Sequence, residues 1–318
     1  MSAQPHPGPS SLEINLIERV NVGDILTRAA DLHPQRVAIV DGDRRLTYAQ
    51  LERQVDQLGH ALLGLGLKHQ DVVAVMARNV PELLTTYFAC ARAGLICAPV
   101  NLGLRPAEIA WCLRDARARV LIAEGALAET AREVLAEPLP DLQYRFWIGG
   151  PQGTDAGFDE LVARGADTPL EVPVGDRDVV QLLYTSGTTA NPKGVLTSHL
   201  AVTMSALSNA IAHQCGPGYT ALVALPLFHC AMLNSVTMPV VLMGGRIVLA
   251  KGFEPHQAAA LMADEEVQLM VLLPMMYGLL LGDPALKDRT YPAMKRAMYA
   301  MAPMPEERLK ASHAMFPN

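Results

Sequence analysis

The stretch YTSGTTANPKG, residues Tyr184 to Gly194, decides how this sequence is interpreted. It follows the apolar run VVQLL, which is typical of a buried strand, and precedes SHLAVTMSALSNAIAH, whose apolar residues have helical spacing. Hydroxyl side chains, glycines and a single lysine, Lys193, are gathered in it. Backbone amides and a mobile ammonium group can bind a polyphosphate, and glycine lets the backbone approach closely. A phosphate site is therefore one interpretation, and a solvated turn between a strand and a helix is the other.

Two common phosphate motifs do not describe this stretch. The Walker A motif requires Ser or Thr directly after its lysine, whereas Gly194 follows Lys193 here. The stretch also lacks the G-x-G-x-x-G spacing of a dinucleotide-binding turn. Generic motif knowledge therefore leaves both interpretations open.

Composition favours a protein with a large core and small-molecule or protein partners. Of 318 residues, 50% are hydrophobic and 18% are charged, and the formal net charge is −6. The sequence has no Lys/Arg cluster of the kind that marks a nucleic-acid surface, so we expect no nucleic-acid partner. The 5 cysteines form no CxxC pair and have apolar neighbours. They predict reduced, buried thiols and a cytoplasmic location.

The sequence predicts neither a signal peptide nor a transmembrane segment. Residues 1–20 lack a basic region followed by an apolar one, and we expect a flexible leader there. Residues 194–245 contain no Asp, Glu, Lys or Arg, but prolines and glycines interrupt the run. No apolar stretch reaches the length that a bilayer requires, so a buried interior is the better interpretation.

The rest of the chain alternates short apolar runs with amphipathic stretches. TYAQLERQVDQLGHALLGLG predicts a helix with Thr47 as its N-cap, and VPELLTTYFACARAGL predicts a helix that starts near Pro81 and stops at Gly94. Such alternation predicts an α/β fold with two largely parallel β-sheets flanked by helices. The near-continuous apolar strands indicate that helices cover both sheet faces.

The complete string Thr185-Ser186-Gly187-Thr188-Thr189 with Asn191-Pro192-Lys193-Gly194 resembles the phosphate loop of the adenylate-forming (AMP-binding) superfamily. The acyl-CoA synthetase type fits best, because LPLFH and AMAPMP follow in the order expected for that family. The resemblance covers residues 21–318 and implies the layered N-terminal AMP-binding domain. It divides this domain into a sheet subdomain of residues 71–205 and a second one of residues 21–70 plus 206–318. It also implies that the chain stops before the family's β-barrel and C-terminal domain.

The resemblance implies a two-step reaction. ATP and a carboxylic acid, fatty or aryl, give an acyl-adenylate, and coenzyme A then displaces AMP to give an acyl-CoA thioester. No catalytic residue is assigned. The implied binding residues are Thr185, Ser186, Gly187, Thr188, Thr189 and Lys193 for the ATP phosphates, Thr185 also for Mg²⁺, Phe228 and His229 for the acid, and Ala300, Met301, Ala302 and Pro303 for adenine.

Some features depart from the family pattern and leave alternatives open. Ala190 and Met301 stand where the family usually has glycine or another small residue, and no Y-G-x-T-E string is present. Because the resemblance implies that catalysis also needs the family's later residues and its C-terminal domain, we expect residues 1–318 alone to be nearly inactive. The alternatives are a non-catalytic acyl- or nucleotide-binding module and an amino-acid adenylation domain. His229 as a core histidine, Ala300 to Pro303 as an ordinary turn, and self-association into a homodimer also stay open.

Overall fold

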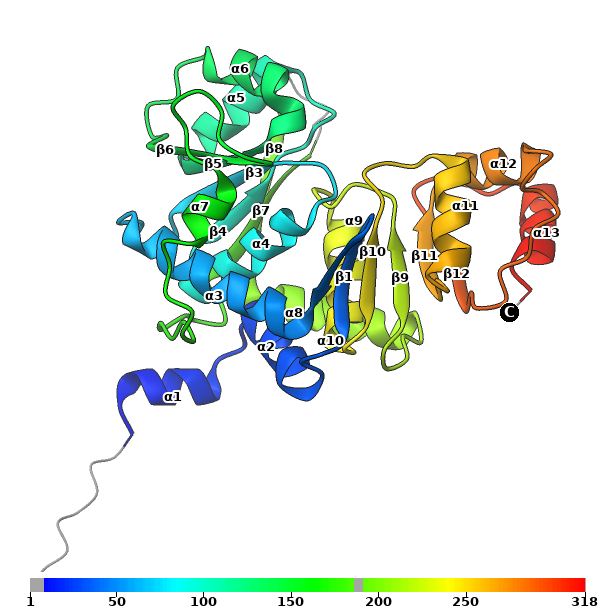
Figure 1. Ribbon diagram of the computed structural model, residues 1–318, viewed down its shortest axis with the longest axis horizontal. Helices are drawn as coiled ribbons and strands as arrows, with labels where there is room; N and C mark the ends of the chain where they lie inside the picture. The colour runs from blue at the N-terminus through cyan, green and yellow to red at the C-terminus, as the bar shows by residue number, and fades with distance from the viewer. Residues whose placement is uncertain (1–8, 186–190, 318) are drawn as a thin grey trace, which may run out of the picture.

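The structure is a computed structural model that describes residues 9–185 and 191–317 (Figure 1). It contains two six-stranded sheets. Sheet I has the order β6-β5-β3-β4-β7-β8, and sheet II has the order β12-β11-β9-β10-β1-β2. The strands of sheet I are β3 (Val72–Met76), β4 (Ile96–Pro99), β5 (Ala118–Glu124), β6 (Tyr144–Ile148), β7 (Val179–Thr185) and β8 (Lys193–Ser198). Those of sheet II are β1 (Val37–Asp41), β2 (Arg44–Thr47), β9 (Thr220–Val223), β10 (Arg246–Leu249), β11 (Leu269–Leu272) and β12 (Arg296–Tyr299).

Both sheets are largely parallel, which confirms the predicted fold class. Only the β1–β2 and β7–β8 pairs are antiparallel, and each lies at one edge of its sheet. The carboxyl ends of the parallel strands therefore meet along one edge of each sheet. Ligands of open α/β sheets bind outside this edge.

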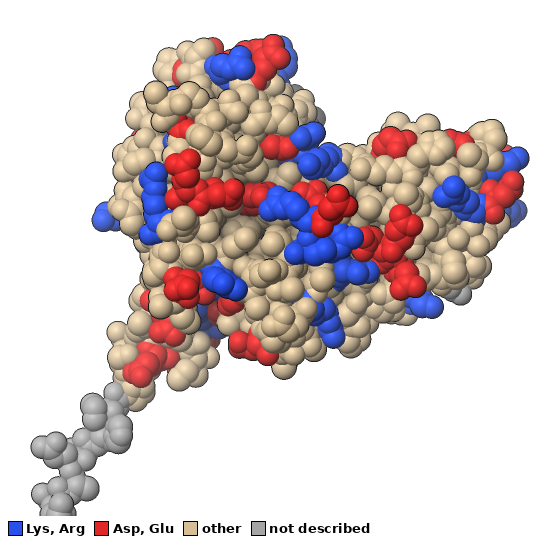
Figure 2. Space-filling model, in the orientation of Figure 1, with Lys and Arg blue, Asp and Glu red and all other residues tan. Residues whose placement is uncertain are grey.

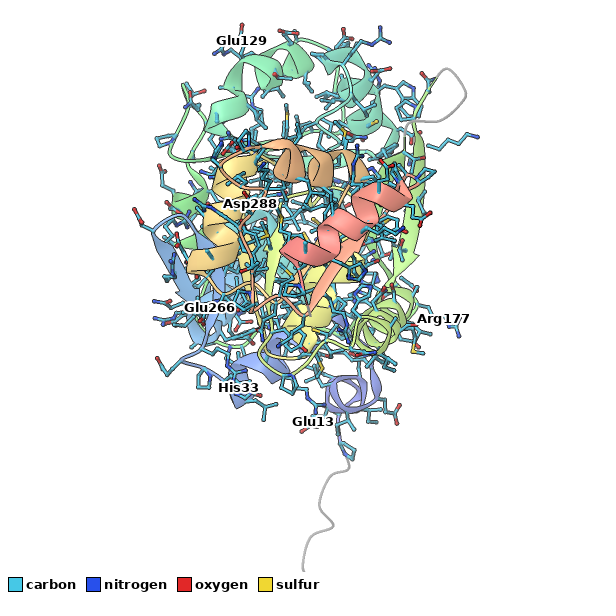
Figure 3. The ribbon with its side chains drawn as sticks, turned by 90° about the vertical axis from the view of Figure 1, so that its right-hand side faces the viewer. Glu13, His33, Glu129, Arg177, Glu266 and Asp288 are labelled. Carbon is cyan, nitrogen blue, oxygen red and sulfur yellow. The ribbon has the colours of Figure 1, made fainter. Side chains whose placement is uncertain are left out.

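Helices form layers between the sheets and outside them (Figure 1). The middle layer holds α2 (Val22–Leu32), α3 (Tyr48–Gly64), α4 (Pro81–Ala93), α7 (Phe158–Val162), α8 (His199–Ala212), α9 (Cys230–Met232), the π-helix η2 (Leu233–Thr237) and α10 (Met238–Leu242). Outside sheet I lie α5 (Pro106–Asp115), the short 3₁₀ helix η1 (Gly125–Leu127) and α6 (Ala128–Leu135). Outside sheet II lie α11 (Pro255–Asp264), α12 (Pro274–Gly282) and α13 (Glu306–Met315), which face the viewer in Figure 3.

Side-chain alternation along the strands produces this layering. In β9, Ala221 and Val223 join the central core, whereas Leu222 joins the core under α11 and α12. In β5, Ile122 faces the central core and Leu121 faces α5 and α6. Both faces of these inner strands are therefore buried, as the continuous apolar runs predict.

Local helix signals in the sequence are confirmed. The Thr47 hydroxyl accepts a hydrogen bond from the Gln50 amide, and the Gln50 side-chain oxygen accepts one from the Thr47 amide. Pro81 is the first residue of α4, and Gly94 ends that helix with φ of 68°. The left-handed backbone at Gly94 explains why a glycine stands there.

The predicted strand–loop–helix arrangement around Lys193 is wrong in one respect. A second strand, β8, follows the phosphate stretch before α8 begins. The stretch therefore joins two antiparallel strands, and Thr185 pairs with Lys193 in their register. The short run KGVLTS carries little strand signal because four of its six residues are exposed at the sheet edge.

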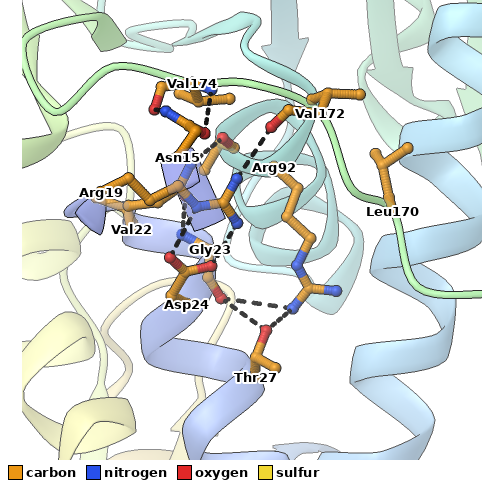
Figure 4. Close-up of polar contacts among 12 residues, drawn as sticks. Asn15, Arg19, Val22, Gly23, Asp24, Thr27, Arg92, Leu170, Val172 and Val174 are labelled. Carbon is orange, nitrogen blue, oxygen red and sulfur yellow. Dashed lines mark hydrogen bonds and ion pairs between the residues drawn. The ribbon is translucent and has the colours of Figure 1, made fainter. Parts of the chain in front are cut away.

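The expected flexible leader is also wrong for residues 11–18, which form α1 (Ser11–Glu18). The Asn15 side chain exchanges two hydrogen bonds of 3.0 Å with the Val174 backbone, and Arg19 donates to the Val172 carbonyl and to Asp24 (Figure 4). These bonds tie the segment to the linker that precedes β7. These contacts are made by polar side chains, Asn15 and Arg19, and a search for apolar periodicity does not detect such contacts.

Two surface properties complete the description. Cys90, Cys97, Cys112 and Cys215 are buried as predicted, but Cys230 is exposed, because it starts α9 beside the carboxyl edge of sheet II. Lys/Arg and Asp/Glu side chains are interspersed on the face shown in Figure 2. The Arg44–Glu82 ion pair joins β2 of sheet II to α4. Within the described ranges, no helix combines the length and the apolar character that a membrane crossing needs.

Candidate functional site

The phosphate stretch is held at its two ends by the last pair of the β7–β8 hairpin. Thr185 ends β7, Lys193 starts β8, and the Thr185 hydroxyl lies 3.5 Å from the Lys193 carbonyl oxygen. Both residues are exposed, and no ion pair occupies the Lys193 ammonium group among residues 9–185 and 191–317. The hairpin thus presents an unpaired cation and a hydroxyl together. The predicted phosphate residues Ser186, Gly187, Thr188 and Thr189, and also Ala190, lie outside the described residues.

The hairpin base is packed against α5. The Tyr184 hydroxyl donates a hydrogen bond of 2.7 Å to Asp115, and its ring meets Trp111 edge-on with centroids 6.2 Å apart. Burial and the bond to Asp115 raise the pKa of Tyr184 above its ordinary value, so the hydroxyl stays protonated. Across the hairpin, Tyr184 pairs with Gly194, where an added Cβ would lie 3.3 Å from the ring. Gly194 therefore leaves room for the Tyr184 ring.

The predicted acid segment follows β9 of sheet II. Phe228 is half-buried, His229 is exposed, and their ring centroids are 5.9 Å apart. The His229 carbonyl accepts backbone bonds from Met232 and Leu233 and so starts α9. The His229 ring has no hydrogen-bond partner in the described part of the chain. His229 is therefore not a core histidine, and its ring is available at the surface.

The predicted adenine segment follows β12. The Ala300 amide donates to the Leu272 carbonyl at 3.3 Å, while Met301, Ala302 and Pro303 are exposed. Met301 has φ of 68°, a left-handed backbone that glycine adopts at less cost. Because β11 lies between β9 and β12, the acid and adenine segments start two strand spacings apart, about 10 Å.

Sequence reasoning missed one residue that shapes this site, Asn79. It follows β3 of sheet I, is buried, and hydrogen-bonds to residues 223–227 and to Ala250 of sheet II. The run ARNVPEL, between a strand and a helix, has the composition of a surface turn. Its sequence therefore does not indicate that the Asn79 side chain is buried. In the described residues, no hydrogen bond or ring contact joins Lys193, His229 and Met301 to one another.

Comparison with known proteins identifies the class. The family model for AMP-binding enzymes matches residues 26–318, so the chain belongs to the AMP-binding enzyme family, and the resemblance seen in the sequence is confirmed.

Individual relatives are CoA ligases. The chain is 33% identical over 287 residues to feruloyl-CoA synthase from Amycolatopsis sp., covering 90% of this chain and 55% of that protein. It is 28% identical over 292 residues to the long-chain-fatty-acid–CoA ligase FadD13 of Mycobacterium tuberculosis, covering 91% and 57%. The chain thus spans about half the length of these relatives. In a solved structure, the N-terminal domain of FACL13 from Mycobacterium tuberculosis matches with a TM-score of 0.85 and 25% identity, covering 92% and 73%.

Proposed function

We propose that the complete protein activates a carboxylic acid with ATP and then forms an acyl-CoA thioester. The carboxylate of the acid attacks the α-phosphate of ATP and pyrophosphate leaves. The thiol of coenzyme A then displaces AMP from the acyl-adenylate. The family match and the CoA-ligase relatives support this reaction class. The observation that carries the proposal is the hairpin end at the carboxyl edge of sheet I, where the exposed residues Thr185 and Lys193 pair across the strands and no described residue forms an ion pair with Lys193.

This hairpin end fits the triphosphate tail of ATP. In the proposal, Lys193 neutralises charge on the β- and γ-phosphates, and Ser186 to Thr189 bind the same phosphates. Mg²⁺ keeps several waters and takes few protein ligands beside substrate phosphates, and in the proposal the exposed Thr185 hydroxyl is one of those ligands. When bound, the ion stabilises the leaving pyrophosphate. The chain's own task is to position the tail and balance its charge.

The acid and the adenine ring belong to sheet II in this proposal. Phe228 and His229 border the acid, and Ala300 to Pro303 flank the adenine ring. A fatty or an aryl acid is the proposed substrate class, because relatives named for ferulate and for long-chain fatty acids are both similar to this chain. A cytoplasmic location and a homodimer remain predictions.

Acid-dependent ATP–pyrophosphate exchange by the complete gene product tests the proposal. A panel of fatty and aryl acids should support exchange. Lys193→Ala should raise the KM for ATP about 10-fold or more, since it removes the only described cation at the hairpin end. His229→Ala should change chiefly the KM for the acid. Lys287→Ala and His256→Ala, exposed residues at other loops and helix starts, are matched controls that should leave both constants unchanged. Absence of exchange with every acid contradicts the proposal.

A non-catalytic binding module is the second candidate, and Met301 is the observation that favours it. Its exposed side chain stands in the predicted adenine segment. Such a module should bind nucleotide or acid without exchange. We further propose that residues 1–318 alone turn over little, because they correspond to 55–57% of the relatives' length.

A further inference from the structure

Asn79 is a buried amide that reaches from one sheet to the other. It follows β3 of sheet I and is 3% exposed. Its Nδ2 donates to the carbonyl oxygens of Ala250 at 2.8 Å, Leu225 at 3.0 Å and Val223 at 3.3 Å. Its Oδ1 accepts from the Leu227 amide at 2.9 Å.

These bonds engage both ends of the side-chain amide, its NH₂ group and its oxygen, and fix its orientation. An asparagine amide has two N–H donors and one carbonyl acceptor. The two shorter bonds take the two donors, and Val223 shares one of them at a longer distance. Turning the amide over would set its oxygen against three carbonyls and its NH₂ against the Leu227 N–H. Only one orientation therefore satisfies the buried groups.

The atoms that Asn79 holds belong to the segment that carries His229. Val223, Leu225 and Leu227 alternate along an extended stretch, and the Leu225 and Leu227 side chains are buried. Phe228 and His229 follow directly after the last anchored amide. The Ala250 carbonyl, just beyond β10, adds the neighbouring strand end to the same anchor. Asn79 thus fixes the position of the backbone from which the Phe228 and His229 side chains extend.

The proposed reaction divides its two substrates between the two sheets. The hairpin that ends in Thr185 and Lys193 belongs to sheet I, and the acid segment belongs to sheet II. The acid carboxylate must nevertheless meet the α-phosphate in line, and an error of about 1 Å in such a placement costs about 100-fold in rate. A polar tie from the carboxyl end of β3 to the acid segment fixes this distance.

We propose that Asn79 is a positioning residue for acid activation. It fixes the place of the acid segment that follows β9 relative to the phosphate hairpin of sheet I. This inference rests on the proposed function. It acts on the acid side of the reaction, because every partner of the Asn79 side chain lies at the end of β9 or β10 or in the segment that follows β9, and none lies in the hairpin.

The kinetic test uses the complete gene product. Asn79→Ala and the isosteric Asn79→Asp should raise the KM for the acid or lower kcat by about 10- to 100-fold, while the KM for ATP stays within about twofold. Asn21→Ala is the matched control, since Asn21 is equally buried, at 3% exposed, and also bonds backbone groups, the Ala91 carbonyl and the Gly23 amide. It should lower the melting temperature without changing either KM.

A second measurement works without turnover. The Leu227 amide donates to Oδ1 of Asn79, so its hydrogen exchange should become about 10-fold faster or more in Asn79→Ala, which removes the acceptor, and stay unchanged in Asn21→Ala. Unchanged exchange at Leu227, or equal shifts of both KM values in the Asn79 variants, overturns the inference. If the unaltered protein shows no pyrophosphate exchange, the proposed function fails instead, and Leu227 exchange still decides whether Asn79 holds the segment.

Discussion

His199, the first residue of α8, is a fully buried imidazole with a defined protonation state. Its Nδ1 accepts a hydrogen bond of 3.1 Å from the Val22 amide at the start of α2. Its Nε2 is buried without a partner in the described residues. Burial lowers the pKa of His199 from 6.5 to about 4, against the opposing charge of Asp178. The neutral ring therefore joins α8, which follows the phosphate hairpin, to the N-terminal helices.

This pKa predicts acid sensitivity. The unfolded chain binds a proton at His199 near pH 6.5, whereas the folded chain binds it near pH 4. Stability from His199 is thus complete above the higher value and is lost as the pH falls toward the lower one. Between about pH 7.5 and about pH 5.5 the loss should be roughly 1.4 kcal/mol. Urea unfolding of the unaltered chain and of His199→Gln, compared at both pH values, measures it. Equal acid losses in both proteins would contradict the prediction.

At the residue scale, exposed candidate site residues could be predicted from the sequence better than buried polar residues that support the site. Lys193 and His229 are exposed and close to distinctive strings, so motif similarity found them. Whether they bind ATP and acid remains a prediction. Asn79 and His199 have their roles because backbone groups that are far away in the sequence contact them in the fold. Residue spacing along the chain does not predict such contacts.

At the scale of elements, the packing of the β7–β8 hairpin requires a glycine at position 194. A Cβ on Gly194 would lie 2.8 Å from Cδ1 of Leu182 and 3.3 Å from the Tyr184 ring, which Asp115 holds in place. Gly194→Ala should therefore lower the free energy of unfolding by about 1–3 kcal/mol. Gly64→Ala, at the end of α3 with nothing within 4 Å, is the control and should be neutral or stabilising. Denaturant unfolding distinguishes the two. A Gly194 variant as stable as the Gly64 variant would show that Tyr184 can move at little cost.

The helices could be predicted from the sequence more completely than the edge strands. The α3 and α4 boundaries follow from Thr47, Pro81 and Gly94, because caps and stops are local. β8 was missed since its pairing with β7 is decided by backbone bonds across the hairpin. A short exposed edge strand has no buried face to impose an alternating pattern.

At the scale of the whole molecule, apolar strands predicted two sheets covered by helices, but not which helices lie between the sheets. Strands such as β3 and β9 are apolar on both faces, so the sequence does not distinguish the inner face from the outer one. The middle layer is specified instead by buried polar contacts among its helices, above all those of Arg92.

Arg92 of α4 connects three helices of this layer. Its guanidinium lies 2.6 Å from Asp56 and 2.6 Å from Glu52, both of α3, and donates to the Thr27 hydroxyl of α2 at 2.7 Å. Figure 4 shows the Thr27 side of this contact. Burial raises the pKa of Glu52 even with Arg92 beside it, so the charged form of Glu52 depends on the Arg92 cation.

Removing the cation alone should cost far more than removing the whole group. Arg92→Met leaves the buried Asp56 carboxylate and the half-buried Glu52 carboxylate without their cation and should lower the free energy of unfolding by about 3–5 kcal/mol. Adding Glu52→Gln and Asp56→Asn to that variant should recover most of the loss, because the three side chains act as one network. Arg105→Met is the surface control, since its pair with Glu108 is largely exposed and its loss should leave the free energy of unfolding nearly unchanged. Urea unfolding of the four proteins decides the matter: equal losses for Arg92→Met and Arg105→Met would mean that apolar packing alone holds the two sheets around their shared helices.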